Sequence, residues 1–191
     1  MSELNYIVRD IQRRLSNMVK RGRVHSVDFS KTPPRVRVEY AENAVTGWLP
    51  WVSGLASVKG RTDWNPLSIG EQVLIVSESG DLSSGVVIGS LLDSTNTPPS
   101  HSEFEHMTQF DDGTSFSYNR KTHELKVDIK GALSLSTSGK LDISVEGDAY
   151  ISSLGAVSVE SKDSLSINSG GDIDIEAEGN LSLKGTRIDL N

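Results

Sequence analysis

The C-terminal third of this chain repeats every eight residues, and this period constrains the fold more than any other feature of the sequence. Glycine recurs at positions 131, 139, 147, 155, 171 and 179, and Asp163 stands where the one missing glycine would be. Apolar residues follow two and four positions later, so each octad has the form Gly-x-Φ-x-Φ-x-x-x, in which Φ is apolar. Eight octads fit between His123 and Thr186.

An even period keeps all the Φ residues on one face of an extended chain. Side chains alternate sides in a strand, and every Φ residue carries an odd number. The Φ residues can therefore line one interior while the mostly polar even positions face water, with glycine at the corners. The residues predicted to form this apolar core are Leu125, Val127, Leu133, Leu135, Leu141, Ile143, Ile151, Val157, Val159, Leu165, Ile167, Ile173, Ile175, Leu181 and Leu183.

A single chain cannot close these strands into a stable solid. A triangular prism needs about 24 residues per coil, so the octads would give fewer than three coils, too few to bury a core or cap their own edges. Three intertwined chains solve this problem, because each strand then stacks on strands of the other two at ~4.8 Å. The alternative, a disordered Ser-rich tail, would not need apolar residues in register over so long a stretch. We therefore predict a homotrimer with a triple-stranded, intertwined β-helix.

An amphipathic helix is predicted over residues 1–22, with Gly22 as its stop. Its apolar stripe contains Leu4, Ile7, Val8, Ile11, Leu15, Met18 and Val19. Five of these residues also fit a heptad, but over only about two heptads, which is too short to predict a coiled coil. We expect the helix to pack on its own domain. The segment lacks the apolar core of a signal peptide, so we expect synthesis in the cytoplasm.

Residues 23–92 are predicted to form a small all-β barrel, with the OB-fold as the commonest candidate. The candidate strands are Arg23–Asp28, Arg35–Tyr40, Thr46–Trp51, Gln72–Ser77 and Gly85–Ser90. Trp48, Trp51 and Trp64 could form a base-stacking platform, although packing in a core or interface is the simpler interpretation.

A polar linker is predicted over residues 93–104, stiffened by Pro98 and Pro99. Residues 105–122 then form a β-hairpin neck, because Asp112 and Gly113 lie between two alternating apolar stretches. The octads and a terminal tip occupy residues 123–191.

Charge and composition exclude several classes of function. The formal net charge is −7, and residues 121–191 carry seven Lys/Arg against twelve Asp/Glu. Such a surface repels phosphate backbones, so nucleic acid is not expected as a partner. An OB-fold that binds single-stranded nucleic acid would need a basic groove, and the barrel carries more acidic than basic residues. The chain has no cysteine, which excludes disulfides and thiolate metal sites.

The barrel sequence resembles a known family. Its motif runs from Pro66-Leu67-Ser68-Ile69-Gly70 through Val73-Leu74-Ile75-Val76 and Gly80-Asp81 to Gly85-Val86-Val87-Ile88-Gly89. Together with the Asp112-Gly113-Thr114 hairpin and the octads after it, this order resembles the phage baseplate assembly protein V family. These proteins are the central spikes of contractile phage tails and R-type pyocins, and they are related to the needles of type VI secretion spikes.

The resemblance implies a homotrimeric spike in a virion or pyocin-like particle, at the baseplate of the tail. Its barrel would dock on the tail tube or hub, and its needle would be driven through the outer membrane of the target cell. Some members hold an iron ion with a His-x-His pair near the C-terminus. Here the last histidine is His123, so we predict no metal site and no cofactor.

No enzyme is predicted. The sequence lacks a Gly-x-Ser-x-Gly, a His-Glu-x-x-His and a P-loop motif. Asp172, Asp174, Glu176 and Glu178 occupy outward positions of one strand, where they would form a solvated face without a cleft. A carbohydrate-binding or carbohydrate-cleaving β-helix fibre is the alternative. Such a fibre would need aromatics along the shaft, and Tyr150 is the one aromatic residue after Tyr118.

The octad frame breaks at the C-terminus. Gly185 comes two residues early, and the apolar pair moves to even numbers, which sends side chains to the opposite face unless the backbone readjusts. We predict that this segment closes the prism, with three copies of each residue forming a plug and a charged rim; a frayed tail is the alternative. The predicted tip residues are Arg187, Ile188, Asp189, Leu190 and Asn191.

Overall fold

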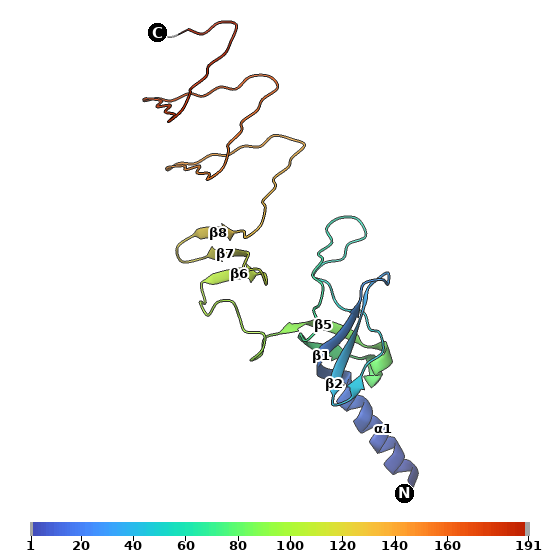
Figure 1. The fold of residues 1–191 in the computed structure, drawn as a ribbon. Coiled ribbons are helices and arrows are strands. Elements are labelled where there is room, and N and C mark those ends of the chain that lie inside the picture. The colour runs from blue at the N-terminus through green and yellow to red at the C-terminus, as the bar shows by residue number, and fades with distance from the viewer. Residues whose placement is uncertain (1, 190–191) are drawn as a thin grey trace. The chain divides into compact units, whose positions relative to one another are not determined.

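The computed structural model of the chain describes residues 2–189. Three parts follow one another along the chain, and each is described by itself. They are a helix with a β-barrel, a three-stranded sheet, and an extended C-terminal segment (Figure 1). The all-β prediction with one N-terminal helix is confirmed.

Helix α1 spans Ser2–Met18 and runs directly into strand β1, Val19–Asp28. The helix is therefore shorter than predicted, and Gly22 is not its stop. Gly22 lies inside β1, where an added Cβ would collide with the Val38 side chain and the Glu39 carbonyl oxygen. The glycine is needed here for close packing between strands rather than for a helix end.

The barrel sheet has the order β3-β2-β1-β4-β5, and all its neighbours are antiparallel. The first half of β1 pairs with β4 and the second half with β2, which lets the sheet coil around its core. The bounds of the other strands are Arg35–Ala41 for β2, Ala44–Val45 for β3, Gln72–Val76 for β4 and Val86–Leu91 for β5.

The segment predicted as the strand Thr46–Trp51 is not a regular strand, yet it closes the barrel. Leu49 exchanges two main-chain hydrogen bonds with Val36 of β2, and the Pro50 carbonyl accepts one from Val87 of β5. Pro50 has no N–H to donate, so a continuous ladder cannot form at this point. The bridge from Leu49 to Val36 of β2 and the bridge from Trp51 to Val87 of β5 join the two ends of the sheet.

The barrel core is small and aliphatic. Its buried residues share the inward positions of β1, β2, β4 and β5, together with two from loops, and they are Val24, Val36, Val38, Leu49, Leu67, Val73, Ile75 and Val87. Buried residues alternate with partly buried ones along the first four residues of β2 and of β4, which is the pattern expected for strands with one face on a core.

Two short 3-10 turns, η1 (Glu78–Gly80) and η2 (Leu82–Ser84), connect β4 to β5 and support the end of α1. The Met18 carbonyl accepts a hydrogen bond from the Ser77 N–H at 2.9 Å. Gly80 has φ +69°, and an added Cβ would collide with the Arg14 carbonyl oxygen. The turn can therefore approach the helix backbone only because this residue has no side chain.

The second part is a three-stranded antiparallel sheet of order β6-β7-β8. Strands β6 (Glu105–Gln109) and β7 (Ser115–Asn119) form the predicted hairpin around the Asp112-Gly113 turn. Strand β8 (Glu124–Asp128) pairs with β7 of the same chain. The first octad, which the repeat assigned to the shaft, thus joins the hairpin, and we call these three strands the neck.

Candidate functional site: the octad segment and the neck

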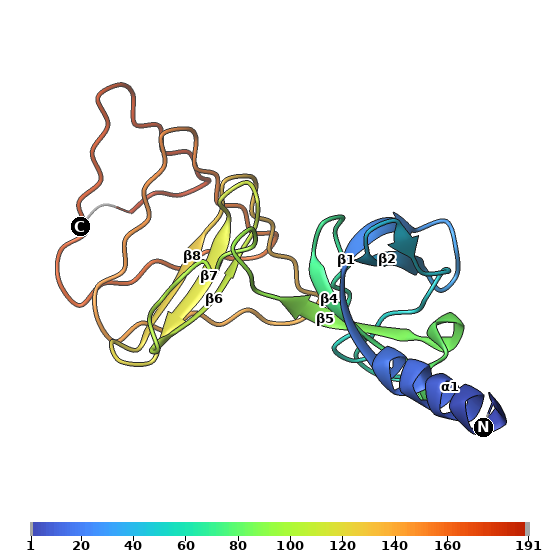
Figure 2. The same ribbon diagram turned by 90° about the horizontal axis from the view of Figure 1, so that it is seen from below.

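The octad segment, residues 131–189, winds through regularly spaced corners without forming strands (Figures 1 and 2). The backbone bends at residue pairs 138–139, 146–147, 154–155, 162–163, 170–171 and 178–179, so the spacing is eight throughout. These bends fall on the glycine of each octad, or on Asp163, and on the residue before it. The predicted corner positions are therefore where the chain bends.

The side chains along the straight stretches alternate as the octad frame requires. Polar residues two positions apart, both with even numbers, meet on the same side of the chain. Lys140 pairs with Asp142 at 2.7 Å, and the Asn168 amide donates to the Ser166 hydroxyl at 2.9 Å. Such i, i+2 contacts form in an extended chain because alternate side chains share a face.

The predicted core residues are uncovered in the single chain. Their exposed fractions run from 49% for Val127 to 93% for Ile151, and none of the fifteen belongs to the buried core. Leu125 and Val127 lie in β8, opposite Tyr118 and Phe116, and the other thirteen lie along the octad segment. One chain therefore does not bring these apolar side chains together.

The octad backbone is also unpaired. Between residues 131 and 189, no main-chain N–H donates to a main-chain carbonyl in the part of the chain that the structure describes. Extended backbone carries one donor and one acceptor per residue, and folded proteins pair nearly all such groups when they are buried. This segment thus offers a row of unsatisfied strand edges beside a row of exposed aliphatic side chains.

Sequence reasoning missed a feature of every second octad, a hydroxyl residue two positions before the corner glycine. Thr137, Ser153 and Ser169 each accept a hydrogen bond from the glycine N–H at the next corner, over 3.1–3.2 Å. These bonds hold the corners locally, as Ser and Thr side chains do in short turns. The signal that could have revealed them is the spacing of sixteen between these three residues.

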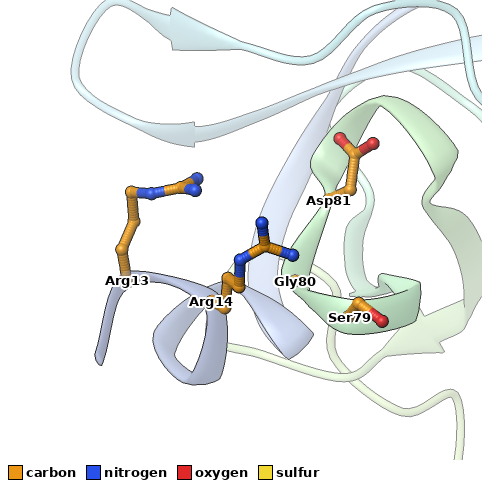
Figure 3. Close-up of a pocket in the computed structure, with 5 residues that line it drawn as sticks. All are labelled: Arg13, Arg14, Ser79, Gly80 and Asp81. Carbon is orange, nitrogen blue, oxygen red and sulfur yellow. The ribbon is translucent and has the colours of Figure 1, made fainter. Parts of the chain in front are cut away.

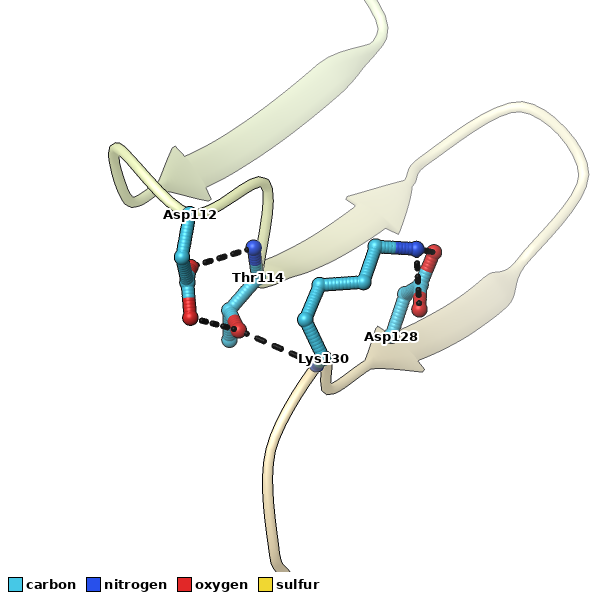
Figure 4. A network of polar contacts seen from close by, with 4 residues as sticks. All are labelled: Asp112, Thr114, Asp128 and Lys130. Carbon is cyan, nitrogen blue, oxygen red and sulfur yellow. Dashed lines mark hydrogen bonds and ion pairs between the residues drawn. The ribbon is translucent and has the colours of Figure 1, made fainter.

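The neck ends in a polar cluster that fixes the start of the octad segment (Figure 4). The Asp112 carboxylate accepts from the Thr114 N–H at 2.7 Å and from its hydroxyl at 2.9 Å. The Lys130 N–H in turn donates to the Thr114 hydroxyl at 3.2 Å, and Lys130 Nζ bonds Asp128. The hydrogen bonds from Lys130 hold the pKa of Asp128 below its usual value.

The tip is described as far as Asp189. The backbone bends at Thr186, in step with the earlier corners, although Gly185 precedes it. Arg187 pairs with Asp189 of its own chain at 2.8 Å, and Ile188 is half exposed. The predicted tip residues Leu190 and Asn191 lie outside the described residues.

The three tryptophans of the barrel pack against different neighbours. Trp51 lies on the core, and its ring centre is 5.9 Å from that of Trp64, which also meets Phe29 edge to face at 6.3 Å. Trp48 instead lies under the Arg37 guanidinium at 5.7 Å. This arrangement is packing among side chains of the barrel rather than three rings along one basic groove.

The acidic residues Asp172, Asp174, Glu176 and Glu178 are exposed, as are all described residues of the octad segment in the single chain. Across residues 2–189, no group of three or more His, Asp or Glu side chains is arranged to hold a metal ion. Nor does any described helix have the length and apolar character needed to span a bilayer.

Comparison with known proteins gives two matches. Residues 20–92 match the family described as the type VI secretion system/phage-baseplate injector OB domain. The chain is also 31% identical, over 134 residues, to the protein named "Spike protein" of Escherichia phage P2. That alignment covers 70% of this chain and 61% of the relative, so the chain spans less than two thirds of the relative's length.

Proposed function

We propose that this chain is the central spike of a contractile tail, because residues 20–92 match the phage-baseplate and type VI injector OB domain and the chain is 31% identical to a phage spike protein over 134 residues. The predicted resemblance to the baseplate V family is thereby confirmed. In the proposed particle, the barrel docks on the tail tube or hub within the baseplate. The C-terminal segment is the needle that punctures the outer membrane of the target cell when the sheath contracts.

The observation that carries this proposal is the state of the octad segment in one chain. Thirteen aliphatic side chains in register are exposed along residues 131–189, and the backbone beside them is unpaired in the described part of the chain. Burying one such side chain is worth about 1.5–3 kcal/mol, and an unpaired buried backbone group costs a comparable amount. Two further copies of the segment, placed as neighbouring strands, would bury the apolar side chains and pair the backbone groups at the same time.

The proposed trimer is an intertwined prism. Each face stacks strands from the three chains in turn at ~4.8 Å, so the seven octads after the neck form a shaft of roughly 35 Å. Odd-numbered residues fill the axis, and even-numbered polar residues such as Lys140 and Asp142 face solvent. A rod of this kind acts mechanically, and it requires no catalytic group.

The native mass of the purified protein tests this architecture. Light scattering coupled to gel filtration should give about three times the chain mass of 20.7 kDa at micromolar concentration. The trimer should also survive SDS without heating, because unfolding it requires three chains to separate together. A folded monomer that binds no further copies would refute the trimeric shaft and the spike function built on it.

A further inference from the structure

Helix α1 carries an apolar stripe that nothing in the described chain covers. Leu4 is 67% exposed, Ile11 50% and Leu15 62%, although a helix of 17 residues normally buries such a stripe against its own domain. The expectation that the helix packs on its own domain through this stripe is therefore not met. The helix touches the barrel with a different face.

The barrel contact of α1 runs along the flank of the stripe. The main-chain oxygen of Arg14 lies against Gly80. The carbonyl of Met18, the last residue of the helix, accepts a hydrogen bond from the Ser77 N–H. Figure 3 shows Arg13 and Arg14 on the helix beside the turn that carries Ser79, Gly80 and Asp81. On the same flank Asp10 bonds Arg13 and Arg14, and these bonds lower the pKa of Asp10.

The uncovered stripe has the spacing of a coiled-coil seam. Leu4, Val8, Ile11, Leu15 and Met18 are separated by four, three, four and three residues, which is a strict a/d heptad. Val8 and Leu15 take the a positions, and Leu4, Ile11 and Met18 take the d positions.

The a and d residues do not by themselves set the number of helices. Leucine at a with isoleucine at d, as at Leu15 and Ile11, shifts coiled coils toward trimers and tetramers, whereas valine at a with leucine at d, as at Val8 and Leu4, favours two strands. The number of helices therefore comes from the proposed trimer. Ile7, at the flanking g position, widens the apolar face beyond a two-stranded seam. The opposite flank at e holds Asn5 and Gln12, whose neutral amides create no charge repulsion between helices.

We propose that the three α1 helices of the trimer pack against one another as a short parallel coiled coil. This inference rests on the proposed trimer, in which threefold symmetry makes the helices parallel. The helix is about 25 Å long, too short to associate by itself. The octad segments supply the association, because they hold the three helices at a high effective concentration. The occupant of the stripe is thus a second and third copy of the same helix.

Single cysteines test the proposal without interference, because the chain has no cysteine of its own. Ile11→Cys places a thiol in the seam, and Arg13→Cys places one outside the seam, on the flank beside the barrel where the Arg13 side chain is 60% exposed, as the matched control. After mild oxidation, heat denaturation and non-reducing electrophoresis, Ile11→Cys should yield disulfide-linked chain pairs. At most two thirds of the chains can link, since one disulfide joins two of three chains. Arg13→Cys should stay largely unlinked.

Two further measurements make the result decisive. The linked fraction of Ile11→Cys should not change on tenfold dilution, because the contact lies within one trimer. Leu4→Cys, another seam position, should behave in the same way if Ile11→Cys folds poorly. A trimeric mass with no linking above the Arg13→Cys control would overturn the coiled coil and leave the stripe to another partner, such as a hub protein. A monomeric mass would instead overturn the proposed trimer itself.

Discussion

Ile143 and Ser144 are adjacent residues that the octad frame assigns to opposite faces of one strand. In the proposed trimer, Ile143→Asp would bring three carboxylates together near the axis. Burying unpaired charge costs several kcal/mol per site, so the melting temperature should fall sharply or the trimer should not form. Ser144→Asp adds the same charge on the solvent side and should be nearly neutral.

Thermal melting followed by circular dichroism, together with native mass, separates the two variants. Equal melting temperatures for Ile143→Asp and Ser144→Asp would mean that the inside and outside of the shaft have been assigned wrongly.

Single glycines mark the limit of what residue patterns can predict. The corner glycines were recognised because they recur, and the backbone bends at each of them. Gly22 follows an amphipathic pattern and was assigned as a helix stop, which was wrong. Its real constraint is the missing Cβ against Val38, which depends on how β1 pairs with the next strand, β2. A sequence alone does not show whether a glycine is needed for its dihedral angles or for its small size.

At the scale of elements, local patterns predicted most of the barrel. Four of the five candidate strands are present, because alternation and turn residues are local signals; three lie within one residue of the predicted bounds, and β1 begins four residues earlier than predicted. The closing segment at Leu49 to Trp51 is not a regular strand, since it bonds two different edges on either side of a proline. The pairing of β8 with β7 was not predicted either, because Leu125 and Val127 fit both the octad frame and a third neck strand.

The boundary between α1 and β1 changes how the helix should be removed. A truncation through Arg21 would delete Val19, Lys20 and Arg21, which pair with β4. Deleting residues 1–17 instead leaves the barrel sheet intact. We propose that the basic helix, with Arg9 and Arg13, helps the barrel to dock on the tail tube or hub. The proposed trimer should then survive this deletion through its octads, but fewer copies should enter assembled particles.

Incorporation can be measured by complementing spike-deficient particles and quantifying the spike in the purified baseplates. Full-length protein is the reference, and native mass confirms the trimer in each preparation. Wild-type levels of the truncated spike in particles would show that the helix does not take part in docking.

At the scale of the whole molecule, the C-terminal segment is proposed to be the working end. Deleting residues 185–191 should open the end of the apolar column and lower the melting temperature. Particles should still assemble, because the barrel is unchanged, but infection or killing should be lost.

An internal deletion provides a matched control for the tip. Removing residues 139–146 takes out one complete octad, so the frame and the tip remain and the shaft shortens by one step of ~4.8 Å. Particles with this spike should keep most of their activity. Full activity of particles with the tip deletion would show that residues 185–191 are not the piercing point.

In the proposed trimer, the hydrogen bond from Lys130 to Thr114 has a consequence for how the three chains are aligned. Successive octads are so alike that sliding one chain past its neighbours by eight residues would restore nearly every contact. Such a slip keeps the apolar residues on the inner face and loses contacts chiefly at the two ends, so the repeat by itself discriminates only weakly between alignments. The neck does not repeat, and its hydrogen bond to Lys130 fixes where the octad segment begins. It would therefore set the register in which the three chains pair.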